Sequence, residues 1–228
     1  MPLQCNLVVA AVATVASCLE LGATILEADD LGIAVTLETA PQRIVSLSPS
    51  NTELLFALGV GDRLVGVTEH CDYPPEAEHI EKIGAFKTLS IEKMLALEPD
   101  LVVAIKGNAL ESLEALRSFD IPVFALNIGS VQQLLEAVSR VGRLTQRQHA
   151  ADSLRTSLTG RLDRVTANVK KRSRRPRMMW GHWGEPIFTA GGKTYIDDVL
   201  RLAGGENLGR RAPGAWPQIS PETVVSWA

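Results

Sequence analysis

The chain has 228 residues, of which 46% are hydrophobic and 21% are charged, so its composition is that of a folded globular protein and excludes a disordered chain. This length allows either two lobes or one domain with additions. The formal net charge of −3 argues against a protein whose main role is to bind nucleic acid or anionic lipid.

The first 28 residues have the pattern of an export leader. Residues 7–19 are apolar apart from one Thr, one Ser and one Cys, a length typical of a signal-peptide core and short for a membrane span. Residues 15–18 read Val-Ala-Ser-Cys and resemble a bacterial lipobox, which predicts lipid modification of Cys18; cleavage near Ala28 is an alternative. No Lys or Arg precedes the apolar run, so a buried amino-terminal helix stays open as a second interpretation.

Residues 29–143 predict a first α/β lobe. Short β-branched runs alternate with helical stretches, and strands that are buried on both faces are typical of a mostly parallel sheet. The predicted strands are 44–47, 64–67, 101–105 and 123–126, and the predicted helices are 52–58, 91–97 and 110–119.

Residues 144–173 predict one long helix that links this lobe to a second one. Apolar residues recur at steps of three and four from Ala151 to Val169, and no proline lies between Pro122 and Pro176. A helix of about 25 residues reaches about 37 Å at 1.5 Å per residue, which is long enough to connect two lobes.

Residues 174–228 predict a second α/β lobe, with strands at 178–180 and 187–189 and a helix at 195–202 that Gly204 and Gly205 close. In the first lobe a further strand begins soon after Glu92, whereas the sequence stops six residues past Glu222. We therefore expect the second lobe to be incomplete at its carboxyl end.

Residues 170–177 form a basic segment between the long helix and the second lobe. We interpret it as the solvated end of the helix, where cations complement the helix dipole, and a nucleic-acid patch is the alternative. The cysteines and the four histidines show no spacing that zinc requires and no catalytic arrangement, so neither a metal site nor an enzyme is indicated.

A short element recurs 130 residues apart in the two lobes. Residues 86–92 and 216–222 both read aromatic, two residues, aliphatic, Ser, any residue, Glu. Each serine is a good N-cap, and each glutamate falls in the first helical turn, where it offsets the helix dipole. The repeat favours two equivalent lobes, and an aromatic side chain from each lip is suited to close on a large flat ligand.

At these residues the chain resembles the helical-backbone (cluster A-II) binding proteins of ABC importers, specifically the cobalamin-binding members. The resemblance covers residues 30–228 and rests on the runs 43–55, 72–75, 98–102, 204–207 and 216–218. The Ser-Pro-Ser run within the first of these is shared widely with haem and siderophore binders. The Asp-Tyr-Pro-Pro and Trp-Pro-Gln runs point more narrowly to corrinoids.

The resemblance implies an α/β protein of two Rossmann-like lobes with mostly parallel sheets, joined by one long rigid helix. It implies a periplasmic or extracytoplasmic monomer that needs no cofactor, carries cobalamin or another corrinoid as transported ligand, and delivers it to an ABC transporter permease. Lipidation at Cys18 would anchor such a protein to the membrane. Candidate ligand contacts are Ser50, Asn51, His70, Tyr73, Phe86, Trp183 and Trp216, and Glu92 and Glu222 match the two acids that dock on the permease.

Several alternatives stay open. Residues 50–53 match a capping box, which favours a structural role for Glu53. His70 is either a polar contact or an axial ligand to a chelated metal, and Trp183 either contacts the ligand or belongs to the core. Haem or a ferric siderophore would suit the same scaffold. A nucleotide-using enzyme is the rival of another class, although the turn at 191–194 lacks the first glycine of a phosphate loop.

Overall fold

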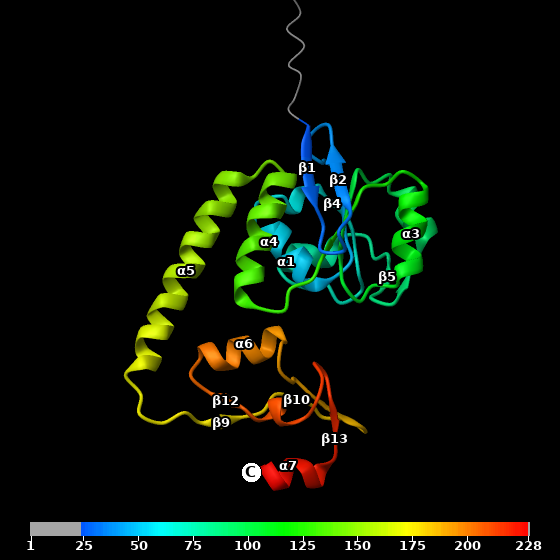
Figure 1. Cartoon of the computed structure of the whole chain (residues 1–228). Coiled ribbons are helices and arrows are strands. Elements are labelled where there is room, and N and C mark those ends of the chain that lie inside the picture. The colour runs from blue at the N-terminus through cyan, green and yellow to red at the C-terminus, as the bar shows by residue number, and fades with distance from the viewer. Residues whose placement is uncertain (1–23, 228) are drawn as a thin grey trace, which may run out of the picture.

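The structure is a computed structural model that describes residues 24–227, and it consists of two lobes joined along one side by a long helix (Figure 1). The strands of the first lobe are β1 (Ile25–Ala28), β2 (Ala34–Leu37), β3 (Ile44–Ser46), β4 (Leu64–Val67), β5 (Gly84–Ala85), β6 (Thr88–Leu89), β7 (Leu101–Ile105) and β8 (Val123–Leu126). Its helices are α1 (Pro49–Ala57), α2 (Ile91–Ala96), α3 (Leu110–Ser118) and α4 (Val131–Leu144). Helix α5 (Gln148–Lys170) leads to the second lobe, which contains β9 (Arg177–Met178), β10 (Gly181–His182), β11 (Ile187–Thr189), α6 (Tyr195–Leu202), β12 (Glu206–Asn207), β13 (Gln218–Ile219) and α7 (Pro221–Trp227).

A four-stranded parallel sheet in the order β4-β3-β7-β8 forms the centre of the first lobe. Alternate residues of β7 pack on opposite faces: Leu101 and Val103 join the core beneath α1 and α4, and Val102 and Ala104 join the core beneath α2 and α3. Burial on both faces explains why these strands read as continuous apolar runs. The predicted parallel sheet is confirmed in this lobe.

Helix α1 begins three residues earlier than predicted. The Ser48 hydroxyl accepts a hydrogen bond from the Asn51 N–H (3.3 Å), so Ser48 is the N-cap and Pro49 occupies the first helical position. Proline is favoured there because the first N–H of a helix has no intrahelical partner in any case. The capping box at 50–53 is therefore a wrong interpretation, and the Glu53 side chain is exposed.

The hairpin of β1 and β2 was not predicted. Ion pairs join it to the rest of the first lobe. Three ion pairs join it to α3 and α4: Asp29–Arg117 (3.2 Å), Asp30–Arg140 (2.5 Å) and Glu27–Arg143. The Asp29 carboxylate is fully buried and also accepts hydrogen bonds from the backbone N–H groups of Leu31, Ile33 and Ala125. This one carboxylate therefore organises the turn of the hairpin and anchors it to the edge strand β8.

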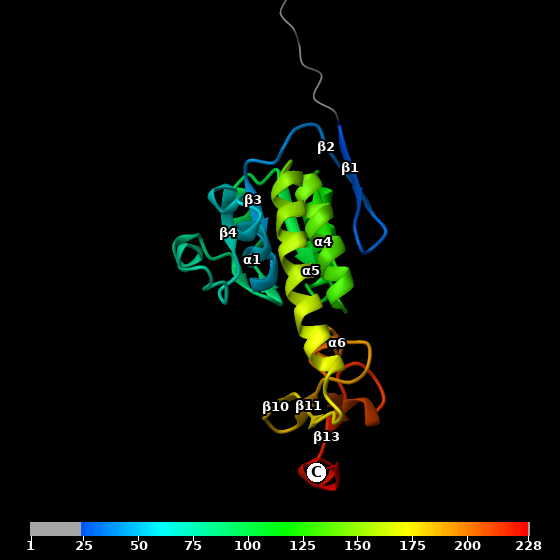
Figure 2. The ribbon, with the colours of Figure 1, turned by 90° about the vertical axis from the view of Figure 1, so that its left-hand side faces the viewer.

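Helix α5 has 23 residues and is about 34 Å long at 1.5 Å per residue. Its amino-terminal half packs along α4, where a side chain at Gly142 would lie 2.5 Å from the Ala151 methyl group. Its carboxyl-terminal half continues beyond the first lobe and reaches the second (Figure 2). The predicted linking helix is thus one continuous helix that contacts both lobes.

The second lobe differs from the predicted mostly parallel sheet. Strands β10, β11 and β13 form an antiparallel sheet, and the parallel pairing among residues 174–227 is that of β9 with β12. Residues 183–186 connect β10 directly to β11, and a connection this short joins only antiparallel strands.

Asn207 organises the turns of this lobe. Its buried amide donates to the Ala190 carbonyl (2.9 Å) and to the Asp197 carboxylate (3.1 Å), and its side-chain oxygen accepts from the Gly209 N–H (3.0 Å). Arg210 completes the network through an ion pair with Asp197 (3.2 Å).

We expect Asp29→Ala to lower the free energy of unfolding by about 2–4 kcal/mol, because it leaves buried N–H donors unsatisfied and Arg117 without its partner. Thermal and denaturant unfolding measure the loss. Glu38→Ala is the matched control, since Glu38 is exposed and makes no ion pair among residues 24–227. Equal stability of the two variants would contradict this account of the hairpin.

Candidate functional site

The carboxyl edge of the parallel sheet faces the second lobe. The loops that follow β3, β4, β7 and β8 gather at this edge, which is where open α/β sheets bind ligands. The first N–H of α4, at Val131, donates to the Asp198 carboxylate of α6 (2.9 Å) and so joins the edge to the second lobe. The candidate site lies along this junction.

Asn51 and Ser50, both predicted ligand contacts, have different surroundings. The Asn51 side chain is 1% exposed and its amide donates to the carbonyl groups of Val103 (3.2 Å) and Ala104 (3.0 Å), so it braces α1 against β7. The Ser50 side chain is exposed, and its hydroxyl lies 3.2 Å from that of Ser48.

Both residues line a pocket of about 630 Å³ between the lobes. Its walls are mostly aliphatic side chains of α1, α4 and α5, and Tyr195 of α6 reaches it from the second lobe. The lining residues are Pro49, Ser50, Asn51, Glu53, Leu54, Ala57, Ile105, Leu126, Ile128, Leu134, Val138, Leu154, Leu158 and Tyr195.

Phe86 is carried on the turn between β5 and β6 and is held against the sheet edge. The Asn108 amide donates to the carbonyl groups of Leu47 (3.1 Å) and Phe86 (3.2 Å), which ties this turn to the end of β3. The Phe86 ring lies against Gly107, where a side chain would be 3.4 Å from the ring. Phe86 is therefore half-buried and fixed in place.

The loop after β4 presents His70 and Tyr73 to solvent, with Tyr73 64% exposed. Between them, the buried thiol of Cys71 lies 3.2 Å from the Thr52 hydroxyl and 3.1 Å from the Thr68 hydroxyl. This contact anchors the loop to α1. It leaves the imidazole and phenol groups free to meet a ligand.

In the second lobe, Trp216 packs against a residue that the sequence analysis missed. The rings of Trp216 and Trp180 meet edge to face, with centroids 5.9 Å apart and planes at 73°, and both remain partly exposed. Trp180 lies two residues after the end of β9, and an aromatic residue at the carboxyl end of a parallel strand is the signal that would have found it.

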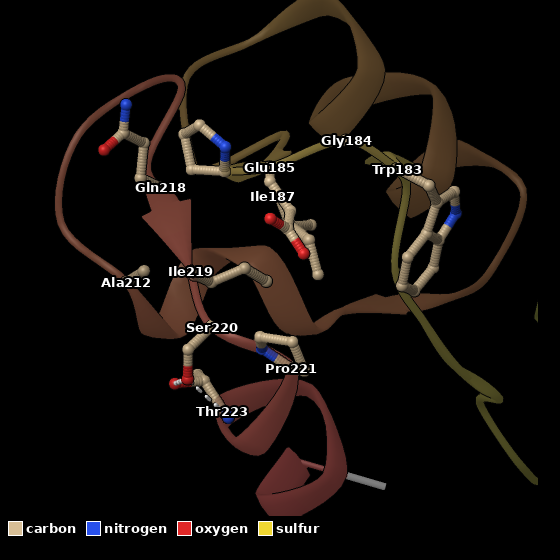
Figure 3. A pocket seen from close by; sticks show the side chains of 11 residues that line it. Trp183, Gly184, Glu185, Ile187, Ala212, Gln218, Ile219, Ser220, Pro221 and Thr223 are labelled. Carbon is tan, nitrogen blue, oxygen red and sulfur yellow. Dashed lines mark hydrogen bonds between the residues drawn. The ribbon is translucent and has the colours of Figure 1, made fainter.

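Trp183 lies in a different hollow of the second lobe. It lines a pocket of about 830 Å³ together with Ile187, Ile219 and Pro221, whereas Trp216 is not part of that lining (Figure 3). Its side chain is 68% exposed, so the alternative that placed Trp183 in the core is wrong. The structure thus brings Trp216 together with Trp180, and not with Trp183.

The two acids of the repeated element have matching geometry. Ser90 accepts from the Lys93 N–H (3.3 Å) and Ser220 from the Thr223 N–H (3.3 Å), so each serine caps its helix. Glu92 and Glu222 are then the second residues of α2 and α7, and both are exposed. The hydrogen bond from Ser220 and a backbone N–H lower the pKa of Glu222, which favours its charged form.

Among residues 24–227 no three His, Cys, Asp or Glu side chains are grouped so that they could hold a metal ion. No helix within the same range combines the length and the apolar character that crossing a bilayer demands. Cys18 and the predicted leader up to residue 23 lie outside the described residues.

Comparison with known proteins identifies the family. The model of the family described as periplasmic binding protein matches residues 44–228. The chain belongs to the periplasmic binding protein family. Proteins of this family are extracytoplasmic solute-binding components that work with ABC transporter permeases in transport.

Within the family, the chain is similar to proteins named vitamin B12-binding protein. One from Photorhabdus laumondii is 32% identical over 192 residues, which are 83% of this chain and 69% of that protein. One from Yersinia pestis is 33% identical over 192 residues, with 82% of this chain and 67% of that protein covered.

Solved structures of the family superpose well on the chain. The crystal structure of the periplasmic vitamin B12 binding protein of Vibrio cholerae gives a TM-score of 0.74 at 28% identity, over 82% of this chain and 73% of that one. The apo form of a periplasmic heme-binding protein from Roseiflexus gives 0.75 at 26% identity, with the same coverage. The two-lobed α/β fold with a connecting helix is thereby confirmed.

Proposed function

We propose that the chain binds cobalamin or a related corrinoid between its lobes and delivers it to an ABC transporter permease. In this proposal residues 29–143 and 174–228 act as the two lobes, and residues 144–173 hold them at a fixed spacing. The similarity to vitamin B12-binding proteins over four fifths of the chain supports a corrinoid as the ligand.

The observation that carries the proposal is the exposed pair of indole rings on the second lobe. A corrinoid is a broad, flat macrocycle with an apolar face, and aromatic rings bury large areas against such faces. Trp180 supports Trp216 from the edge, so the Trp216 ring loses little conformational freedom when a ligand stacks on it.

On the first lobe we assign the facing contacts to Phe86, His70 and Tyr73. The Phe86 ring is braced by Asn108 and Gly107, and the other two side chains project from the loop after β4. Ser50 is well placed to bind polar groups of the ligand at the start of α1. Asn51 contributes in this scheme by bracing Ser50's helix.

Haem is the alternative ligand. The likeness to a heme-binding protein supports it at the level of the fold, and the exposed His70 offers an imidazole that an iron porphyrin would accept as an axial ligand.

We also propose that the residues before Cys18 direct export and that Cys18 becomes the lipid-modified first residue of the mature chain. Mass spectrometry of protein extracted from bacterial membranes tests this idea. A mature chain that starts elsewhere, or that carries no lipid, would contradict the proposed lipid anchor at Cys18.

We expect cyanocobalamin to quench tryptophan fluorescence at lower concentration than haemin or a ferric hydroxamate does, and Trp216→Ala to weaken that binding. The loss should be about 1–3 kcal/mol, roughly 5- to 150-fold in dissociation constant, because one stacked ring is removed. Isothermal titration measures the constants.

Phe119→Ala is the matched control for Trp216→Ala, since Phe119 is an exposed aromatic residue at the end of α3 on the opposite edge of the sheet. An unchanged constant in Trp216→Ala would exclude Trp216 from the site. Tighter binding of haemin than of cyanocobalamin would identify haem, and not a corrinoid, as the ligand.

Reversing the charge at Glu92 or Glu222 should reduce corrinoid uptake and leave the affinity in solution almost unchanged. Exposed charges set orientation and association rate at a docking surface, and both acids lie at helix starts that the ligand need not touch. Uptake by cells and titration of purified Glu92→Lys and Glu222→Lys measure the two effects. Glu38→Lys is the control, and a collapse of ligand affinity in either test variant would contradict the docking role.

A further inference from the structure

The basic segment, residues 170–177, carries more charge than the fold requires. It holds six Lys and Arg side chains in eight residues, all exposed, in a chain whose net charge is −3. Lys170 ends α5 and Lys171 is its C-cap, so these two complement the helix dipole, whose effect fades within the last turn. The four arginines beyond the helix have no such explanation: Arg172, Arg174, Arg175 and Arg177.

These cations are also uncompensated within the described chain. No ion pair joins any of the six to a carboxylate of residues 24–227. Neighbouring like charges repel one another and oppose the compact state unless a partner of opposite charge is near. The Arg177 side chain donates a hydrogen bond to the Trp227 carbonyl (3.2 Å), which does not neutralise its charge, so the segment can attract an external polyanion.

The segment borders the face that carries the proposed docking acid. Arg172, Arg174 and Arg177 line one shallow pocket of about 520 Å³ with Trp227, the last residue of α7. Glu222 lies at the other end of the same helix, about 8 Å along its axis at 1.5 Å per residue. A membrane protein that received Glu222 would therefore bring the surrounding bilayer close to the arginines.

We propose that residues 170–177 bind the phosphate headgroups of an anionic lipid bilayer. Guanidinium groups bind phosphate oxygens in pairs of hydrogen bonds, and a tryptophan beside them suits the boundary between headgroups and acyl chains. The attraction itself depends only on charge, whereas the presence of a bilayer beside Glu222 rests on the proposed function. An extracytoplasmic family favours lipid over nucleic acid as the polyanion.

Vesicle sedimentation with the whole purified chain tests this inference. Vesicles of phosphatidylcholine with about one third phosphatidylglycerol should bind the chain, vesicles of phosphatidylcholine alone should not, and added salt should release it. Arg174→Gln/Arg175→Gln should weaken the partition constant about 25-fold, because each cation near an anionic bilayer contributes about fivefold. Both residues are exposed and lie outside helices and strands, so the fold should be retained.

Arg147→Gln/Arg161→Gln is the matched control, because it also removes two exposed cations from the chain, one before the start of α5 and one within it. Equal binding to both kinds of vesicle, or equal loss in both double variants, would overturn the inference. So would tighter binding to a single-stranded oligonucleotide than to the anionic vesicles at the same salt. Titration of the same preparations with cyanocobalamin separates the two proposals, since vesicle binding without corrinoid binding would reject the function and keep the membrane contact.

Discussion

The placement of the second lobe depends on how α6 is held between α4 and α5. At its amino-terminal end, Asp198 accepts the first N–H of α4 (2.9 Å). At its carboxyl end, Gly204 adopts φ +87° and approaches α5 so closely that a Cβ atom there would lie 2.8 Å from Val169. Glycine is required at this position for two reasons. Other residues adopt a positive φ only at a cost in conformational energy, and their side chains would push α6 away from α5. Since α5 is one continuous helix, these two contacts of α6 fix the spacing between the lobes.

The two lobes are stabilised in different ways. Both apolar core clusters of the described chain belong to the first lobe and the adjoining parts of α4 and α5. Within residues 174–227 the buried apolar side chains are few, namely Ile187, Ala190, Leu208 and Ile219. The second lobe relies instead on the hydrogen-bond network of Asn207 and Asp197. Because apolar burial is the larger source of stability, the second lobe is the part that gains most from contacts with a partner.

Local patterns predicted much of the fold. Strands β4, β7, β8 and β11 and helix α6 have the predicted bounds, because continuous apolar runs and one amphipathic stripe define them in the sequence. Features that depend on distant partners were missed. The β1–β2 hairpin is defined by acids that pair with arginines about 90 to 116 residues away in sequence, which no local pattern reveals.

In the candidate site, too, local features were predicted from the sequence and features that depend on distant residues were not. The repeat of aromatic, serine and glutamate predicted both N-caps and the exposed acids from sequence alone. It did not reveal that Trp180 supports Trp216, because the two are 36 positions apart, or that Asn51 is buried against β7. Burial and ring contacts are tertiary properties. The residue type alone therefore does not tell whether a polar or aromatic side chain contacts a ligand or stabilises the fold.

The proposed ligand capture and the proposed docking use separate chemistry on this scaffold. The indole pair lies on the second lobe and offers broad apolar area, whereas Glu92 and Glu222 lie at the starts of α2 and α7 on the surface. A ligand that bridged Trp216 and the first lobe would add contacts to the less well packed lobe, and so would stabilise the folded chain according to its affinity. The acids proposed for docking are exposed, and charged contacts of this kind contribute mainly to orientation and association rate. The proposed release on the permease therefore requires only the loss of the ligand's contacts with one lobe, without any change in the acids proposed for docking.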